Sequence, residues 1–347
     1  MSNGPLRIEQ YETVRYDINC NPLGVPDSVT RAIMENISAV GRYPDTYYDP
    51  LRNAIASYAC CAPEHLVLGS GSSDLLRLFV ALLAPKKALL PIPSATDYEH
   101  VLSVYGCETD FYELDINQDY HLDMDDFIAH LSDTYDIVIL GNPNNPTSQL
   151  ISKADIEKLA AACKELGIAL LLDEMYIEFT ENYAISLVNT YDNLIILRSV
   201  SKFFSVPGLR LAYAIMNNET NMTIINMTAT PNSISCLTAA ACTAMLEDTA
   251  YIHESHSRIF TERNLIYAAM NTNKNLRLFK PSANFALMQI LKEDVTAKSL
   301  LAHCNLKGIV LRNCENFHGL DSHFVRFSIM NPMQNDLMVN TILELLR

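Results

Sequence analysis

The hydrophobic residues of this chain are gathered into short continuous runs, separated by longer segments of mixed polarity. Five of these runs predict strands, at residues 66–68, 88–93, 136–140, 168–172 and 193–198. The segments between them predict helices; in one, Ile156, Leu159 and Cys163 recur at helical spacing after Ser152, which is a suitable cap. Continuous apolar strands that alternate with helices are typical of a mostly parallel sheet with helices on both faces. We therefore predict an α/β fold.

The pattern changes after about residue 230. Helices are predicted at 233–246, 249–271 and 335–347, and strands at 281–288, 309–312 and 324–328. This order indicates a second, smaller α+β domain. At the other end, the first 30 residues predict an extended arm, after which Asp27 or Ser28 caps a helix. The predicted organisation is an arm at 1–30, a large domain at 31–235 and a small domain at 236–347.

Polar side chains stand just beyond the ends of the predicted strands. They are Ser72 and Ser73 in a small-residue turn, and Tyr98, Asn145, Asp173 and Lys202 in the loops after later strands. Because the carboxyl ends of parallel strands meet at one edge, where open α/β sheets bind ligands, we expect these side chains to share one site. The serine-rich turn opens a helix, so its backbone N–H groups are suited to bind a phosphate.

Lys202 has the surroundings of an amine that reacts with carbonyl compounds. It follows a buried strand, where desolvation favours the neutral, nucleophilic amine. Pyridoxal phosphate is the common cofactor that needs such a lysine. Ser199, Ser201 and Arg210 lie nearby in the sequence and could hold the phosphate of that cofactor.

The other polar groups of a pyridoxal site also have candidates. Asp173 fits the anion that keeps the pyridinium nitrogen protonated, so that the ring accepts electrons. Asn145 and Tyr176 could donate hydrogen bonds to the phenolic oxygen of the ring. We therefore predict pyridoxal 5'-phosphate as the cofactor.

The composition narrows the possible partners. The 347 residues include 25 basic and 40 acidic side chains, a formal net charge of -15, which argues against nucleic acid or an anionic membrane as the main partner. Nine scattered cysteines without a Cys-x-x-Cys pair favour reduced thiols and a cytoplasmic location. No secretion signal is recognisable, and no apolar run is long enough to span a bilayer.

Four other interpretations are weaker. The acids at 115–126 have several EF-hand spacings, but Tyr120 replaces the required glycine. His253 and His256 share one helix face without a fixed cluster of further metal ligands. A serine acyl-enzyme built on Ser199 and Lys202 would also need Ser-Asp-Asn and Lys-Thr-Gly tripeptides, which are missing. A purely binding or regulatory module is disfavoured because every cofactor position is filled.

Several short motifs occur together across nearly the whole chain. They are Asn19-x-Asn21-Pro22-Leu23-Gly24, Arg42-Tyr43-Pro44-Asp45, the segment 141–147, Asp173-x-x-Tyr176, Ser199-x-x-Lys202 and Arg210. In this combination the chain resembles the fold-type I pyridoxal-phosphate enzymes of the class I/II aminotransferase superfamily. Within it, the chain is similar to the branch of histidinol-phosphate aminotransferase and the threonine-phosphate decarboxylase of cobalamin biosynthesis. The resemblance implies an aspartate aminotransferase-like fold whose arm packs on the small domain and on a homodimer partner.

The resemblance also implies residue roles. Lys202 would form the Schiff base, Asp173 would pair with the pyridinium nitrogen, Asn145 and Tyr176 would contact the ring oxygen, and Tyr98 would stack on the ring. The residues implied at the phosphate are Ser72, Ser73, Ser199, Ser201 and Arg210, with Tyr43 of the neighbouring subunit. The residues implied at the substrate are Asn21, Asn145, Asn284, Arg312 and Arg326.

Two reactions are compatible with this resemblance. Residues 202–210 resemble the decarboxylase form more than the aminotransferase form, which usually has Ala-Gly before Leu-Arg, and residues 312–326 are also decarboxylase-like. The chain departs from the decarboxylase at residues 2–4, which replace a His-Gly-Gly-Asn opening, and at Ala212, where glycine is usual. Our hypothesis is decarboxylation of O-phospho-L-threonine or O-phospho-L-serine in cobalamin biosynthesis. The alternative is an aminotransferase of the histidinol-phosphate type that uses 2-oxoglutarate and glutamate.

Overall fold

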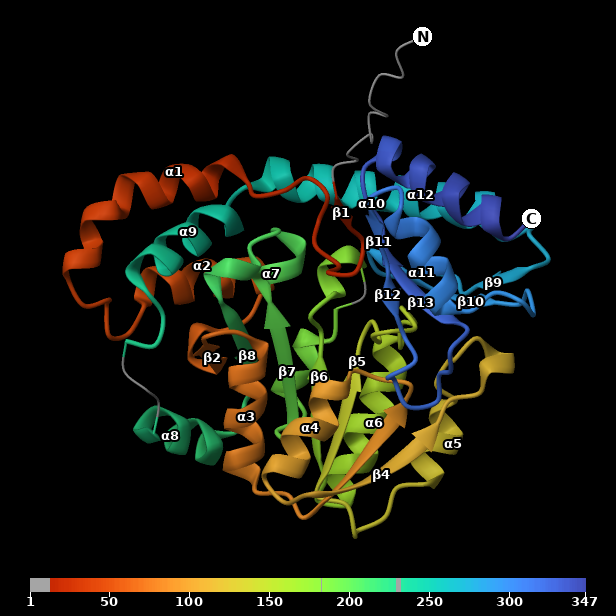
Figure 1. Cartoon of the computed structure of the whole chain (residues 1–347). Coiled ribbons are helices and arrows are strands. Elements are labelled where there is room, and N and C mark those ends of the chain that lie inside the picture. The colour runs from red at the N-terminus through yellow and green to blue at the C-terminus, as the bar shows by residue number, and fades with distance from the viewer. Residues whose placement is uncertain (1–12, 182, 229–231) are drawn as a thin grey trace.

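A seven-stranded sheet forms the centre of the larger part of the molecule (Figure 1), which a computed structural model describes at residues 13–181, 183–228 and 232–347. In spatial order its strands are β2 (Leu66–Gly69), β8 (Ala212–Ile215), β7 (Leu194–Ser199), β6 (Ala169–Asp173), β5 (Ile137–Gly141), β3 (Lys87–Ile92) and β4 (Glu108–Glu113). β8 is antiparallel to both neighbours, and the other neighbouring pairs are parallel. This confirms the predicted α/β fold with a mostly parallel sheet.

Successive residues of the central strands pack on opposite faces of this sheet. On β6, Leu170 and Leu172 pack with α5 (Met124–Ala129) and α6 (Lys153–Glu165). Leu171 packs on the other face, whose helices are α3 (Ser72–Leu83), α4 (Thr96–Val104) and α8 (Glu219–Thr228). Ser152 caps α6 as predicted, since its hydroxyl accepts the N–H of Asp155.

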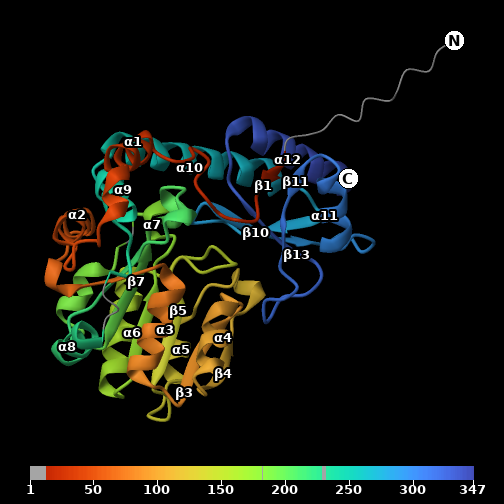
Figure 2. The same ribbon diagram turned by 60° about the vertical axis from the view of Figure 1, so that its left-hand side comes forward.

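A second, four-stranded antiparallel sheet lies beside the first (Figure 2). Its strands, in order, are β12 (Arg312–Asn313), β13 (Phe324–Ser328), β10 (Phe285–Ile290) and β9 (Leu276–Leu278), and its helices are α10 (Thr249–Met270), α11 (Ala297–Asn305) and α12 (Pro332–Leu345). The N-terminal segment joins this part, because β1 (Val14–Arg15) pairs with β11 (Ile309–Val310).

The remaining helices surround the two sheets. They are α1 (Asp27–Asn36), α2 (Asp49–Ala59), α9 (Cys236–Leu246), the short α7 (Val200–Phe203), and the 3-10 turns Ile37–Gly41, Pro63–His65, Ile116–Gln118, Ile177–Phe179, Ile185–Asn189 and Pro207–Leu209. α1 lies against α9, across the expected boundary at residue 235. The division at residues 30 and 235 stays a prediction.

Three local predictions were wrong. Pro26, not Asp27 or Ser28, occupies the cap position of α1, and no side chain caps that helix. Residues 309–312 belong to two short strands, because β11 pairs with β1 whereas Arg312 on β12 pairs with β13. Tyr98 lies within α4 rather than in a loop.

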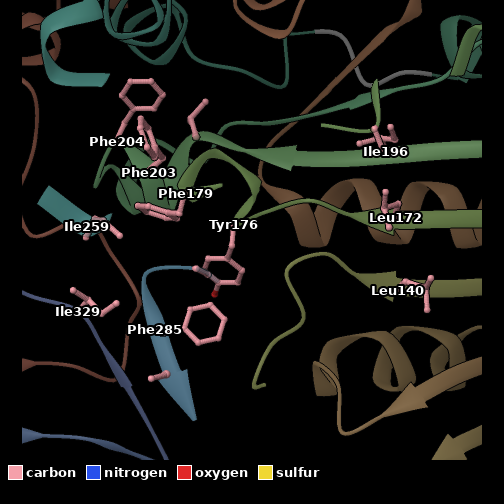
Figure 3. Packing of buried hydrophobic residues seen from close by; sticks show 14 of the residues in the cluster. Leu140, Leu172, Tyr176, Phe179, Ile196, Phe203, Phe204, Ile259, Phe285 and Ile329 are labelled. Atoms are coloured by element: carbon pink, nitrogen blue, oxygen red, sulfur yellow. The ribbon is translucent and has the colours of Figure 1, made fainter. Parts of the chain in front are cut away.

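An aromatic cluster joins the two parts near the ends of β6 and β7 (Figure 3). The ring of Tyr176 packs edge-on against Phe285 of β10, with centroids 4.8 Å apart. Phe203 of α7 packs against Phe179 and Phe204, each at 5.2 Å. These contacts fix the segments after β6 and β7 relative to the second sheet.

Candidate active site

A cavity of about 350 Å³ opens at the carboxyl edge of the large sheet, between that edge and the second part of the molecule. Eleven residues expected at a site line it together: Ser72, Ser73, Tyr98, Asn145, Asp173, Tyr176, Ser199, Ser201, Lys202, Arg210 and Arg326. β6 and β7 end at Asp173 and Ser199, so the sheet itself delivers two of these side chains. The structure therefore brings these strand-end residues together around one cavity.

One end of the cavity is a cradle for an anion. α3 begins at Ser72 without a side-chain cap, which leaves its first N–H groups free to bind a negative charge. Gly71, just before it, has φ +101, and a Cβ there would clash with Nη2 of Arg210. Glycine is therefore needed for the guanidinium to approach the helix N-terminus.

Two hydroxyls complete the cradle. The Oγ atoms of Ser199 and Ser201 are 2.8 Å apart, and both side chains are buried in the cavity wall. With the N-terminus of α3 and Arg210, this donor set fits a phosphate dianion.

Asp173 lies half-buried at the end of β6. One carboxylate oxygen accepts a hydrogen bond from the Tyr98 hydroxyl at 2.7 Å, and the other accepts the N–H of Met175 at 3.0 Å. Burial raises the pKa of Asp173 to about 6, although both hydrogen bonds oppose that shift. A carboxylate held in this way is suited to pair with a protonated ring nitrogen.

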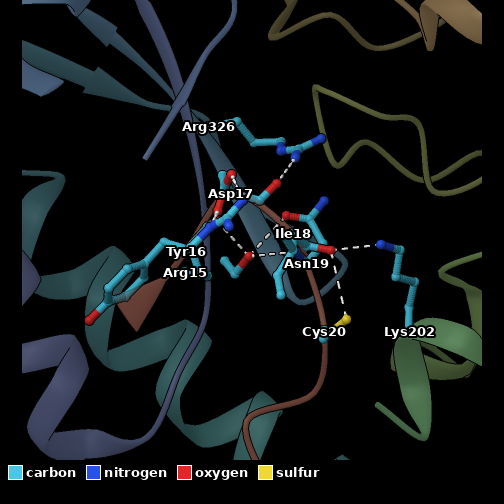
Figure 4. Close-up of polar contacts among 9 residues, drawn as sticks. Arg15, Tyr16, Asp17, Ile18, Asn19, Cys20, Lys202 and Arg326 are labelled. Atoms are coloured by element: carbon cyan, nitrogen blue, oxygen red, sulfur yellow. Dashed lines mark hydrogen bonds and ion pairs between the residues drawn. The ribbon is translucent and has the colours of Figure 1, made fainter. Parts of the chain in front are cut away.

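Lys202 stands on α7, one turn after β7, and is half-buried. Its Nζ donates a hydrogen bond of 2.7 Å to the backbone carbonyl of Ile18 in the N-terminal segment (Figure 4). The amine therefore faces the cavity from the sheet side, and the N-terminal segment closes the opposite side.

Arg326 of β13 is buried and held at both guanidinium ends. Nη1 donates to Oδ1 of Asn145. Nη2 donates to the backbone carbonyl of Asp17 at 2.7 Å (Figure 4). Within the described ranges, its Nε has no hydrogen-bond partner. Since Asn145 turns its oxygen to Arg326, its amide nitrogen is left to donate elsewhere.

Tyr176 approaches the cavity beside these groups. Its hydroxyl accepts a hydrogen bond from Nδ2 of Asn19 at 3.3 Å. The hydroxyl hydrogen of Tyr176 therefore stays available for another acceptor.

Four predicted site residues do not line this cavity. The amide nitrogen of Asn21 donates hydrogen bonds to the carbonyl of Phe203 and the hydroxyl of Ser255, which link the arm to α7 and α10. Asn284 donates to the carbonyl of Asn19. Arg312 lies opposite Arg326 across the two strands but bonds Asn316 at 2.8 Å. Tyr43 is 88% exposed on the far loop after α1.

Two acidic residues of the cavity wall were not predicted. Asp97 precedes Tyr98 in the first turn of α4. Asp17 binds Arg15 through two hydrogen bonds of 2.7 Å and offers its carbonyl to Arg326. Only the fold brings Asp17 to Arg326, so no local sequence signal could have found it.

The structure shows other roles for residues of the two metal sites considered in the sequence, the acidic segment at 115–126 and the His253–His256 pair. Asp115 and Asp123, from the acidic segment, cap the 3-10 turn Ile116–Gln118 and α5. His256 packs its ring against Phe203 at 5.3 Å. In the described part of the chain, no group of three or more His, Cys, Asp or Glu side chains is placed to hold a metal ion. No helix there is long and apolar enough to cross a membrane.

Comparison with known proteins identifies the class. The family model for aminotransferase class I and II matches residues 12–342, so the chain belongs to this family. It is 29% identical over 343 residues to the threonine-phosphate decarboxylase of Salmonella typhimurium. The alignment covers 98% of this chain and 93% of the relative.

Solved structures give the same class. The histidinol-phosphate aminotransferase of Clostridium acetobutylicum is 33% identical, with a TM-score of 0.89 over 95% of this chain and 98% of that one. That of Sinorhizobium meliloti, solved with pyridoxal-5'-phosphate, is 21% identical, with a TM-score of 0.86 over 100% of this chain and 95% of that one, and shows the fold alone. The expected branch and the aspartate aminotransferase-like fold are confirmed.

Pyridoxal 5'-phosphate is the cofactor of this family, which confirms the prediction. The residues present fit it: the Gly71 cradle suits its phosphate, the Asp173 carboxylate its ring nitrogen, and the Lys202 amine its aldehyde. The chain is therefore a pyridoxal-phosphate enzyme.

Proposed function

We propose that this enzyme decarboxylates an O-phospho-L-amino acid, threonine or serine phosphate, to an amino-alcohol phosphate in cobalamin biosynthesis. The observation that carries the proposal is Arg326, a buried cation in the cavity wall whose Nε has no partner among the described residues. A carboxylate or phosphate of the substrate would satisfy it. The Salmonella typhimurium relative and the decarboxylase-like segments at 202–210 and 312–326 support decarboxylation.

The cofactor, when bound, supplies an electron sink for the bond that breaks at the α-carbon. In our proposal Asp173 keeps a proton on the ring nitrogen, and Asn145 and Tyr176 donate to the phenolic oxygen. Lys202 would provide the amine that holds the cofactor and would return a proton to the α-carbon. The ring of Tyr98 would stack on the cofactor.

Arg326 would decide which bond breaks by orienting the substrate. The cofactor would favour cleavage of whichever α-carbon bond the site presents to it. If Arg326 held the substrate phosphate, the α-carboxylate would be free to leave as carbon dioxide. If Arg326 held the carboxylate instead, Lys202 would remove the α-hydrogen, which would lead to transamination.

Transamination of the histidinol-phosphate type, with 2-oxoglutarate and glutamate, is therefore the second candidate. The structure that is 33% identical, a histidinol-phosphate aminotransferase, favours it. Asn21, Asn284 and Arg312 stay proposed as residues that reach the substrate, which would require a rearrangement because all three side chains are engaged elsewhere.

A homodimer is part of the proposal. Tyr43 would reach the cofactor phosphate of the partner subunit from its exposed loop. Exposed apolar side chains near it are suited to an interface between copies: Met34, Ile37, Val40 and Tyr47, at 70%, 56%, 62% and 71% exposure. We also propose a cytoplasmic location, since all nine cysteines are free thiols.

Two assays on the holoenzyme decide between the reactions. Phosphothreonine and phosphoserine are tested for release of carbon dioxide, and histidinol phosphate with 2-oxoglutarate is tested for glutamate. A Lys202→Ala variant serves as the control for reactions of the free cofactor. Carbon dioxide from neither phosphoamino acid would reject the decarboxylase, and glutamate formation would establish the aminotransferase.

A further inference from the structure

A second pocket lies behind the candidate active site, on the opposite face of the large sheet. On β7, Leu197 and Ser199 line the active-site cavity, whereas Arg198 between them points to the other face. There it lines a pocket of about 290 Å³, here called the rear pocket. Its other main residues are Tyr58, Glu178, Tyr183, Ser186 and His256.

The floor of the rear pocket carries ionisable groups that are almost fully buried. Arg198 is 2% exposed and binds one carboxylate oxygen of Glu174 through Nε at 2.8 Å and Nη2 at 2.6 Å. Glu178, which is 4% exposed, also lines the pocket. Its Oε2 has no hydrogen-bond partner among the residues that the structure describes.

The charges of this floor do not balance. Glu174 occupies the guanidinium of Arg198, so ionised Glu178 has a backbone hydrogen bond and a longer-range attraction to the same cation, but no ion pair of its own. His256 does not compensate, because burial lowers its pKa and keeps the ring neutral. An unpaired buried carboxylate is costly, and one further positive charge would remove that cost.

The walls indicate what kind of cation fits. Tyr58 and Ile252 present aromatic and aliphatic surface, and the guanidinium of Arg198 already stacks on the ring of Tyr183 at 5.2 Å. The rim is open, since Tyr183 is 42% exposed and Ser186 is also exposed. A ligand with an ammonium head and a short alkyl part matches this combination of carboxylate, ring and aliphatic wall.

We propose that the rear pocket binds a small organic cation, with its ammonium group on Oε2 of Glu178 and its alkyl part against Tyr58 and Ile252. The site is separate from the cofactor cavity, and the inference does not depend on which reaction the enzyme catalyses.

The test uses holoenzyme and N,N-dimethylpropylamine, a protonated tertiary amine that cannot condense with the aldehyde of the cofactor. At pH 8 Glu178, whose pKa burial raises to about 7, is mostly ionised. We expect the amine to raise the Tm saturably, and the neutral 2-methylpentan-2-ol of similar shape to leave it unchanged. Glu178→Gln should weaken amine binding by about 10-fold or more.

Two further variants make the result decisive. Glu293→Gln removes an exposed carboxylate between β10 and α11, so it should bind the amine like the wild type. Ser186→Phe narrows the mouth of the pocket and releases the ammonium of Lys153, which donates to the Ser186 hydroxyl at 2.7 Å, and it should abolish binding. The proposal is overturned if the wild type shows no saturable shift, if the alcohol acts like the amine, or if Glu178→Gln binds as tightly as Glu293→Gln.

Discussion

The hydroxyl of Tyr98 donates a hydrogen bond of 2.7 Å to the carboxylate of Asp173, linking the first turn of α4 to the end of β6. The same carboxylate is the proposed partner of the cofactor ring nitrogen. This hydrogen bond lowers the pKa of Asp173 against the opposing effect of burial. Tyr98 therefore helps to set the pH range in which the carboxylate is ionised.

Tyr98→Phe should weaken cofactor binding at the acid end of its pH range. Without the donor, the pKa of Asp173 rises above about 6, so the carboxylate is neutral over more of the range near pH 6 to 7. We expect cofactor affinity to fall there and to recover at higher pH, as measured by titration at several pH values. Tyr112→Phe, which removes a similar bond to exposed Asp126, is the matched control. An unchanged pH profile would contradict this role.

Asp173→Asn should change the stability of the cofactor-free protein in a pH-dependent way. The folded pKa of about 6 exceeds the ordinary value of 3.8, so the folded state holds this proton more tightly and loses stability as pH rises from about 4 to 6. The loss amounts to about 3 kcal/mol. The variant has no carboxyl group to ionise at this position, so its free energy of unfolding, measured with urea, should not show this fall. Its stability should therefore compare better with that of the wild type above pH 6 than at pH 4. Asp133→Asn, at an exposed turn, should follow the wild-type profile.

Gly71→Ala should disrupt the phosphate cradle. The added Cβ would meet the Arg210 guanidinium, and φ +101 is strained for alanine. We expect cofactor affinity to fall by about 10-fold or more, with a smaller loss of fold stability of about 1 kcal/mol. Gly208→Ala is the control, because a Cβ there meets no atom within 4 Å and Gly208 lies two residues from Arg210. Equal affinities of the two variants would contradict the cradle.

Hybrid dimers test whether Tyr43 acts across the interface. Tyr43→Ala and Lys202→Ala subunits are each expected to form defective homodimers. If Tyr43 serves the partner, each mixed dimer contains one intact site and one doubly altered site. Random mixing of equal amounts should then restore about one quarter of wild-type activity. No recovery above the two separate variants would place Tyr43 in its own subunit or outside the site.

The sequence predicted the parts of the fold whose signal is local. β6 and β7 are continuous apolar runs, and the structure places them within one residue of the prediction. β4 was missed because Glu108–Glu113 is largely polar and half-exposed at the sheet edge. β8 was missed because periodicity cannot tell a short apolar run such as Ala212–Ile215 from a segment of buried helix.

In the candidate site, too, local sequence signals could place some residues and not others. Residues at the ends of strands, such as Asp173 and Ser199, reach the cavity because the sheet edge fixes their position. Asn284 and Arg312 lie close to it, but their side chains turn to other partners, which a residue pattern cannot show. Tyr98 was misplaced since α4 begins after Ala95, which provides no side-chain cap.

The hydrogen bond from Lys202 to the Ile18 carbonyl has a consequence for the cofactor-free protein. The backbone around that carbonyl is held in place, because Ser328 donates to the carbonyl of Tyr16 and accepts the N–H of Asn19. The amine can release the carbonyl by rotation of its own flexible side chain, while the acceptor stays where it is. Loss of the cofactor should therefore return this amine to one defined position rather than leave it free in solvent.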